Sequence, residues 1–368
     1  MIPEDNRFES DPADALPDDP GLAAGWQAES PDGDDPATIE RLVELLREHE
    51  RAGRGWASSG EDAVRVEVSD RGLAMRENVV LRDPDGRIQA WGSVHDRASG
   101  RMLFVHIVAR DLDERVAARC SDVLFAWAQT QAEAVGAARG VPEQQIDTGA
   151  FADDERQHAW LAAAGFERVR TWWQMSRPVE PAEAELVPDP ARWERKGVVF
   201  RLVERQGGPD SGGMPDEADL RAVHDVLEGA FTDHFNSTEE TFDEFIHRLR
   251  EDPGHRWDHW WLAEITDEAG RTEAAGALVG SVSESDTGPD GSYVAYLGVL
   301  ESARGRGVAT GLLRTIIADA ASRGRDRVGL EVDADSPTGA DGLYTSMGWA
   351  TSYVTESWHR TVTTSTTG

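Results

Sequence analysis

One stretch of the sequence combines glycine and arginine at a spacing suited to binding an anion. An apolar segment ends near Leu300, and the turn Arg304-Gly305-Arg306-Gly307 follows it. Apolar residues then recur at helical spacing, at Val308, Leu312, Leu313, Ile316 and Ile317. The order strand, glycine turn, helix exposes backbone N–H groups at the positive end of a helix dipole, and arginine adds charge. The pattern predicts a site for a phosphate-bearing ligand.

The turn by itself also fits a helix start that merely tolerates glycine. It is neither a dinucleotide fingerprint nor a Walker loop, because the glycine spacing and the Gly-Lys-Ser/Thr ending are missing. The surrounding order is more specific: Val299-x4-Arg304-Gly305-x-Gly307-x-Ala309, a strand-like segment at 327–333, Ser336-Pro337-Thr338-Gly339-Ala340, and Leu343-Tyr344-x3-Gly348-Trp349. This succession resembles the GNAT superfamily of acyl-CoA-dependent N-acetyltransferases, clearly over residues 197–360 and more faintly over the first half.

The resemblance implies an acetyl-CoA co-substrate and a set of residues that hold it. Main-chain groups of Leu297, Gly298 and Val299, on a splayed or bulged strand, would bind the pantetheine arm and face the thioester oxygen. The pyrophosphate would lie on Arg304, Gly305, Arg306, Gly307, Val308, Ala309 and Thr310. Ser336 stands where relatives often carry asparagine, and serine reaches less far. Tyr344 matches the tyrosine that protonates the coenzyme thiolate, with a packing aromatic as the alternative.

The sequence does not identify a general base. Relatives often use a carboxylate on the strand before the glycine loop, but residues 292–300 contain no Asp or Glu. Glu264, Glu284 and Glu331 lie on neighbouring predicted strands and could substitute, although a solvated charge at a strand end is the simpler explanation for each of them. An amine that is already deprotonated would need no base.

The acceptor pocket should border the segment between the first two helices of the second half. Asp233 and His234 lie in that segment, and Glu264 is a further substrate-binding candidate. A capping or surface role for the histidine is the alternative. Four tryptophans could form an apolar wall or simply pack in the core: Trp257, Trp260, Trp261 and Trp358. We expect no metal, because His247, His255 and His259 have no carboxylate or cysteine at ligand spacing.

Composition narrows the class of protein. With 368 residues, 39% hydrophobic residues and 13 Trp, the chain suits two globular domains. A net charge of −32 argues against nucleic acid and would attract a cationic amine, although it also simply promotes solubility. The single cysteine, Cys120, excludes an internal disulfide. Without an apolar run of membrane length or a secretory signal, we expect a cytoplasmic protein with no membrane partner.

The predicted elements occur twice in the same order. In the first half they are a helix from residue 36, strands at 78–82, 87–94 and 102–109, a helix at 114–135, a strand near 144–148, and a helix at 153–164. In the second half they are helices at 217–231 and 239–250, strands at 259–265, 274–283 and 293–299, the glycine-loop helix, a strand at 327–333, and a helix at 339–347 before a last strand. We expect a disordered acidic tail at 1–20, domains at 21–176 and 197–360, a linker at 177–196 and a loose tail at 361–368.

The first half lacks the residues that would bind the cofactor. With Val108 aligned to Val299, Asp113 falls opposite Arg304, and carboxylates there would repel a pyrophosphate. Leu161 stands at the position of Tyr344 in the matching pattern Trp160-Leu161-x3-Gly165-Phe166, so the proton donor is missing too. This half should keep the fold without the cofactor site.

The sequence therefore predicts an α/β protein of two tandem GNAT-like domains, each a mixed, mainly antiparallel sheet flanked by helices. The resemblance implies acetyl transfer from acetyl-CoA to a primary amine of a small molecule by direct attack in the second domain. A regulatory protein that binds acyl-CoA without turnover is the alternative. The sequence makes no prediction of oligomeric state.

Overall fold

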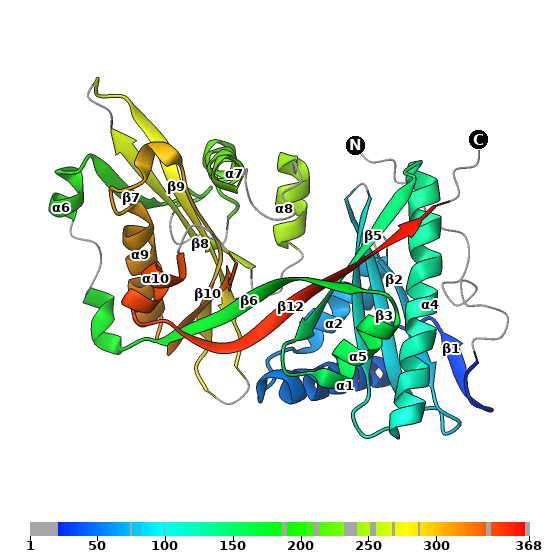
Figure 1. The fold of residues 1–368 in the computed structure, drawn as a ribbon. Coiled ribbons are helices and arrows are strands. Elements are labelled where there is room, and N and C mark those ends of the chain that lie inside the picture. The colour runs from blue at the N-terminus through cyan, green and yellow to red at the C-terminus, as the bar shows by residue number, and fades with distance from the viewer. Residues whose placement is uncertain are drawn as a thin grey trace. The chain divides into compact units, whose positions relative to one another are not determined.

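The computed structural model describes residues 21–73, 76–98, 100–185, 190–208, 213–231, 241–250, 255–266, 269–285, 288–335 and 340–364 (Figure 1). The chain divides into two compact units. Unit 1 comprises Met1–Trp173, Asp333–Asp335 and Tyr353–Gly368. Unit 2 comprises Gln174–Val332 and Ser336–Ser352. Each unit is a mainly antiparallel sheet flanked by helices, so the expected fold class is confirmed.

The first half of the sequence supplies most of unit 1. Its elements are β1 (Gln27–Glu29), α1 (Pro36–Arg54), α2 (Glu61–Val68), α3 (Asp70–Leu73), β2 (Arg76–Arg82), β3 (Ile88–Ala98), β4 (Arg101–Val108), α4 (Glu114–Arg139), β5 (Glu143–Phe151), α5 (Glu155–Ala163) and β6 (Glu167–Pro178). Asp35 caps α1, because its carboxylate accepts the N–H groups of Ala37 and Thr38, and Gly55 ends the helix in the left-handed conformation with a φ of 87°.

The sheet of unit 1 has a hydrophobic core on each face. Successive residues of a strand contribute to different cores, because their side chains point to opposite faces of the sheet. Val79 and Leu81 pack with α4, and Val80 packs with α1 and α2. Cys120, the single cysteine, is buried in the α4 core, and burial raises the pKa of its thiol to about 12.

The second half repeats this order in unit 2. Its elements are η2 (Pro181–Glu185), α6 (Pro190–Glu194), β7 (Val198–Leu202), α7 (Glu217–Phe231), α8 (Phe242–Arg250), β8 (His255–Thr266), β9 (Thr272–Ser283), β10 (Gly291–Val299), η3 (Glu301–Ala303), α9 (Val308–Ser322), β11 (Arg327–Asp333), α10 (Ala340–Ser346) and β12 (Ala350–Thr363). The expected helices and strands are all present within a few residues of their predicted ends. β1, α2, α3, β6, α6 and β7 were not predicted, because short or weakly periodic segments carry little signal.

Helices cover both faces of the unit 2 sheet. Ala277 and Val279 of β9 belong to the core that contains the apolar residues of α7 and α8. Gly276 and Gly280 face the other way, where their hydrogen atoms meet Val308 and Ile316 of α9. The side of the sheet that carries α7 and α8 is called the α7 face below, and the opposite side the α9 face.

The last strands of the two halves are exchanged. The strand order within unit 1 is β1-β2-β3-β4-β5-β12-β6, and within unit 2 it is β6-β11-β10-β9-β8-β7. β12, the end of the second half, pairs with β5 from Thr355–Phe151 to Thr363–Glu143. Trp358 of β12 is therefore buried in the α4 core of unit 1 and does not line an acceptor wall in unit 2. The units thus differ from the expected domains 21–176 and 197–360, and the expected linker 177–196 lies in unit 2.

The internal repeat predicted from two short patterns is present in the backbone. Gly165 and Gly348 both take positive φ values, 80° and 94°. After each glycine the next residue makes the same hydrogen bond: Phe166 N–H donates to Leu161 O at 2.9 Å, and Trp349 N–H donates to Tyr344 O at 3.1 Å. Leu161 and Tyr344 thus occupy equivalent positions.

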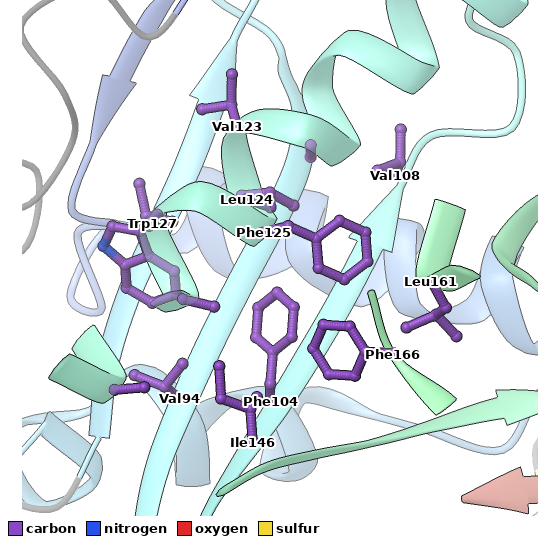
Figure 2. Close-up of a cluster of buried hydrophobic side chains, with 14 of the residues drawn as sticks. Val94, Phe104, Val108, Val123, Leu124, Phe125, Trp127, Ile146, Leu161 and Phe166 are labelled. Carbon is purple, nitrogen blue, oxygen red and sulfur yellow. The ribbon is translucent and has the colours of Figure 1, made fainter. Parts of the chain in front are cut away.

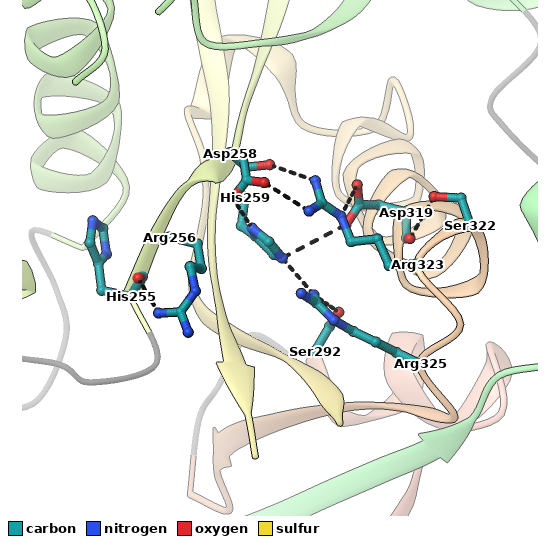
Figure 3. A network of polar contacts seen from close by, with 9 residues as sticks. All are labelled: His255, Arg256, Asp258, His259, Ser292, Asp319, Ser322, Arg323 and Arg325. Carbon is teal, nitrogen blue, oxygen red and sulfur yellow. Dashed lines mark hydrogen bonds and ion pairs between the residues drawn. The ribbon is translucent and has the colours of Figure 1, made fainter. Parts of the chain in front are cut away.

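A polar network joins α9 to the strands of unit 2 (Figure 3). Arg323 bridges two carboxylates, at 2.7 Å from Asp258 and 2.9 Å from Asp319. His259, which is fully buried, lies 2.6 Å from Asp258 through Nδ1 and 2.5 Å from Arg325 through Nε2. An arginine can only donate, so Nε2 is the unprotonated acceptor and Nδ1–H donates to Asp258.

This network is not a hydrolytic triad, although it contains serine, histidine and aspartate. Arg325 donates to Ser292 Oγ at 2.8 Å and also to His259 Nε2, so the guanidinium takes up the nitrogen that a nucleophilic serine would need. Burial and the neighbouring Arg325 lower the pKa of His259 to about 4. The histidine is a neutral structural group.

Replacing His259 should weaken the pH dependence of stability. Its folded pKa of about 4 lies below the ordinary value of 6.5. As pH falls from 6.5 towards 4, the unfolded chain binds a proton here and the folded chain does not, so stability is lost. We expect His259→Gln to reduce the slope of unfolding free energy against pH by up to about 1.4 kcal/mol per pH unit. Urea unfolding at pH 7 and pH 5 measures this, and an unchanged slope would contradict it.

Candidate acyl-CoA site

Strand β10 leaves its neighbour β11 where an extra residue interrupts it. The parallel pairs are Ser292–Val328, Tyr293–Gly329 and Val294–Leu330. Ala295 is then an extra residue in β10, because Val294 and Tyr296 lie opposite consecutive residues of β9. β10 continues beside β9 to Val299, and its recorded pairing with β11 stops at Val294. The two strands therefore part after Val294, and the interval between their unpaired ends is called the gap below.

The gap is lined on one side by main-chain groups of β10. Leu300 donates its N–H to Ala275 O of β9 at 2.9 Å. Because residues of an antiparallel strand turn alternately towards the partner and away from it, Leu297 and Val299 direct their main-chain groups away from β9. This arrangement suits the role expected for these two residues.

Gly298 has a packing reason to be glycine. Its main-chain groups turn towards β9, by the same alternation. A Cβ at Gly298 would lie 2.9 Å from Leu227 Cδ2 and 3.1 Å from Ala230 Cβ, both on α7. The absence of a side chain thus lets α7 lie directly over β10 beside the gap.

The glycine turn after β10 has the backbone conformation that the sequence predicted. Gly305 and Gly307 take positive φ values of 77° and 83°, which favour glycine. Gly307 is the N-cap of α9 and provides no side-chain cap. The N–H groups of Val308, Ala309 and Thr310 belong to the first turn of the helix, where the backbone offers no acceptor. They remain suited to an anion.

The turn also has a cation that the sequence analysis did not single out. Lys196, the only lysine of the chain, lies within the expected linker. Its Nζ is 3.4 Å from Arg306 O and 4.7 Å from the ring centre of Trp193. A Cβ at Gly307 would lie 3.0 Å from the buried indole of Trp193. This contact could not be predicted from the sequence, because only the fold brings residues 193–196 to the glycine turn. The single lysine of an arginine-rich chain could still have marked the residue as a candidate.

Tyr344 lies in α10 with its ring 6.1 Å from that of Trp349. Burial raises the pKa of its phenol above the ordinary value, so the hydroxyl keeps its proton. Its counterpart Leu161 packs in the core beside α4, the equivalent of α9. The repeat therefore puts Tyr344 on the α9 side of the unit 2 sheet, the side that carries the glycine turn.

Other predicted residues fall elsewhere or outside the described ranges. Glu264 of β8 pairs with Arg201 at 2.8 Å, and the same guanidinium holds Asp219 at 2.7 Å. This pairing on the far strands of the sheet leaves Glu264 out of the site proposed below. Ser336, Asp233 and His234 lie outside the described residues.

Trp257, Trp260, Trp261 and His255 belong to the packing of unit 2. Trp260 and Trp261 are buried, and Trp257 lies 4.3 Å from His255 and 5.2 Å from Trp260, measured between ring centres. Burial lowers the pKa of His255 to about 4. Within the described ranges no group of three or more His, Cys, Asp and Glu side chains could hold a metal ion. Every helix in those ranges is too short or too polar to cross a membrane.

In unit 1 the turn after the equivalent strand is shorter and carries its own carboxylate. α4 begins at Glu114, six residues after Val108, whereas α9 begins at Val308, nine residues after Val299. Asp113 is therefore the N-cap of α4 and corresponds to Gly307, which corrects the alignment with Arg304. Its carboxylate accepts Arg115 N–H at 3.0 Å, so the chain's own anion occupies the helix terminus.

Side chains fill the corresponding gap of unit 1. β4 and β5 also pair at only three positions, from Arg101–Gln145 to Leu103–Asp147. Arg156 of α5 donates to Val108 O at 3.0 Å and to Ala109 O at 3.3 Å, at the position where β10 keeps its main chain open. Figure 2 shows Phe125, Phe166 and Leu161 converging beside Val108, all in one buried cluster. Unit 1 thus has the same parting of strands, with a guanidinium bound to the main chain and a buried apolar cluster beside it.

Several solved structures share the fold of this chain. A GCN5-related N-acetyltransferase from Sphaerobacter thermophilus is 20% identical, with a TM-score of 0.67 over 93% of this chain and 97% of that one. A tandem GNAT protein from the clavulanic acid biosynthesis pathway is 15% identical, with a TM-score of 0.64 over 92% and 99%. N-myristoyltransferase of Saccharomyces cerevisiae is 12% identical, with a TM-score of 0.57 over 96% and 86%. The fold is that of tandem GNAT proteins.

Sequence comparison gives the family of one part of the chain. Residues 220–349 match the acetyltransferase (GNAT) family. These residues are a GNAT domain, and they contain the gap, the glycine turn and Tyr344. No curated protein matches the sequence significantly.

Calorimetric titration should find one acetyl-CoA site per chain. The double change Arg304→Glu/Gly307→Val should abolish binding, because it reverses a charge and puts a branched side chain where φ is 83° and Trp193 leaves little room. Arg115→Glu, an exposed residue at the start of α4, is the matched control and should bind as wild type does. A second site, or binding that survives the double change, would contradict the assignment to unit 2.

Lys196→Gln should weaken the same binding about 3- to 10-fold, a loss of about 0.7–1.4 kcal/mol for one phosphate contact at an exposed site. Arg195→Gln removes a neighbouring exposed charge and should have little effect. Equal losses in the two variants would mean that only net charge matters.

Proposed function

We propose that unit 2 transfers an acetyl group from acetyl-CoA to a primary amine of a small molecule. The GNAT family supports acyl transfer from an acyl-CoA in general. The observation that carries the proposal is the combination of the β10–β11 gap with an uncapped glycine turn at the start of α9. The gap suits the thioester and the glycine turn suits the pyrophosphate, and these two groups lie at opposite ends of the pantetheine arm.

The proposed binding mode follows the residues along the cofactor. The pyrophosphate lies on the first-turn N–H groups, with Arg304, Arg306 and Lys196 around it. The pantetheine arm follows β10 as an extra strand would, hydrogen-bonded to Leu297 and Val299. A main-chain N–H facing the gap then polarises the thioester carbonyl and stabilises the oxyanion that forms there.

In the proposed reaction the amine nitrogen attacks the thioester carbon after the ammonium has lost a proton. Collapse of the tetrahedral intermediate breaks the C–S bond. Tyr344 donates its phenolic proton to the departing thiolate and regains one from solvent. The phenol can do so because it is protonated at neutral pH, and burial raises its pKa further.

A non-catalytic acyl-CoA-binding protein is the second candidate. One observation favours it: β10 from Ser292 to Val299 contains no carboxylate that could serve as a base. The glycine turn and Tyr344 favour the enzyme, because a binding protein needs no buried proton donor. A net charge of −32 favours a cationic partner over nucleic acid in either case.

Tyr344→Phe should separate chemistry from binding. We expect kcat to fall about 10²- to 10⁴-fold, because the thiolate loses its general acid. The dissociation constant of acetyl-CoA should change less than about twofold. Release of free coenzyme A thiol across a panel of primary amines measures the rate, and calorimetry measures binding. Tyr353→Phe, on β12, is the matched control.

Full activity of Tyr344→Phe would show that the tyrosine is not the general acid. Tight binding of acetyl-CoA by the wild type, without turnover on any amine of the panel, would instead support the binding protein.

A further inference from the structure

We propose that Glu331 of β11 binds the ammonium group of the acceptor and takes up its proton, and that Gln174 of β6 positions it. This inference rests on the proposed function, because it names the residues that receive the amine. It also gives the exchanged strand β6 a part in the site.

Glu331 lies on the α7 face of the sheet, opposite to the glycine turn. Tyr293 is opposite Ser281 of β9, and it therefore shares the face of Val279, which packs in the α7 core. Gly329 lies beside Tyr293, with its hydrogen turned towards the tyrosine ring. Side chains two residues apart on a strand share a face, so Glu331 is on the α7 face as well.

Glu331 also lies where the gap begins. The last recorded pair of β10 and β11 is Val294–Leu330, and Glu331 is the next residue of β11. On the facing strand the first residue after the bulge is Tyr296, which belongs to the α7 core and lies 6.5 Å from Phe245 between ring centres. The gap thus has a carboxylate on one side and an aromatic ring on the other.

In this proposal the cofactor and the acceptor amine reach the gap from opposite faces of the sheet. A cofactor held at the start of α9 enters the gap from the α9 face, so its thioester carbon is open to attack from the α7 face. An ammonium group is attracted both to a carboxylate and to an aromatic ring. Glu331 and Tyr296 therefore fit a protonated primary amine that approaches from the α7 face.

Gln174 fixes the orientation of the carboxylate. Its side-chain amide Nε2 donates to Glu331 Oε2. Gln174 is only 8% exposed, although Glu331 itself is exposed. A buried donor of this kind restricts the rotation of the carboxylate and keeps it at the gap. The proton moves from the ammonium to Glu331 and then to solvent, while the amine lone pair forms the new C–N bond.

Glu331→Gln tests the proposal with a side chain of nearly the same shape. With the best amine of the panel, we expect kcat/KM for the amine to fall at least 100-fold, while the dissociation constant of acetyl-CoA stays within twofold of wild type. Glu273→Gln, at the exposed start of β9, is the matched control and should retain activity. Wild-type kcat/KM in Glu331→Gln would overturn the proposal.

Gln174→Leu tests the positioning role. An amide that donates to a carboxylate holds the pKa of that carboxyl down, so its removal should shift the acid limb of the pH profile of kcat/KM to higher pH. A purely structural role would lower thermal stability without moving this limb, and that result would refute the assignment of Gln174. Failure of wild type to bind acetyl-CoA would instead refute the proposed function.

Discussion

The site in unit 2 depends on a strand pair that stops after three residues. β10 follows β9 throughout, yet it leaves β11 after Val294, where Ala295 adds a residue. A sheet normally satisfies its main-chain groups by pairing, so an opening of this kind needs a ligand, water or a side chain. Unit 1 shows the side-chain solution, with Arg156 on Val108 O. In the part of unit 2 that the structure describes, no side chain is hydrogen-bonded to the main chain of Leu297 or Val299, and this difference from unit 1 underlies the proposed cofactor site.

The exchange of the last strands makes each unit depend on both halves of the sequence. Trp358 completes the core of unit 1, although it is encoded at the end of the second half. Gln174 enters unit 2 from the end of the first half and contacts Glu331. The first half therefore supplies strand β6 to unit 2, whether or not it has a ligand of its own.

Buried charges hold the elements that border the site. Arg201 joins β7, β8 and α7 through Glu264 and Asp219, and the network around His259 joins β8, β10 and the end of α9. Such networks are costly to bury unless every group is paired, so they fix geometry more than they add stability. In this protein they fix α9, the helix that follows the glycine turn. The acidic composition of the chain also supplies partners for its arginines.

The sequence by itself determined the elements, the tandem order and the glycine turn. Each of these depends on residues that are close together in the chain and can therefore be recognised from the sequence. Examples are the helical spacing of Val308 and Leu312, the glycines that take positive φ values, and the pattern that ends at Gly348. Only the tertiary structure decided what depends on distant pairing. The exchange of β6 and β12, the contact of Lys196 with the glycine turn, and the facing of Glu331 and Tyr296 join residues far apart in the chain. The position equivalent to Asp113 was also decided by the structure, because the observed start of α4 aligns Asp113 with Gly307 and not with Arg304. Strand register and helix starts are set by packing against the rest of the fold, and periodicity alone does not contain that information.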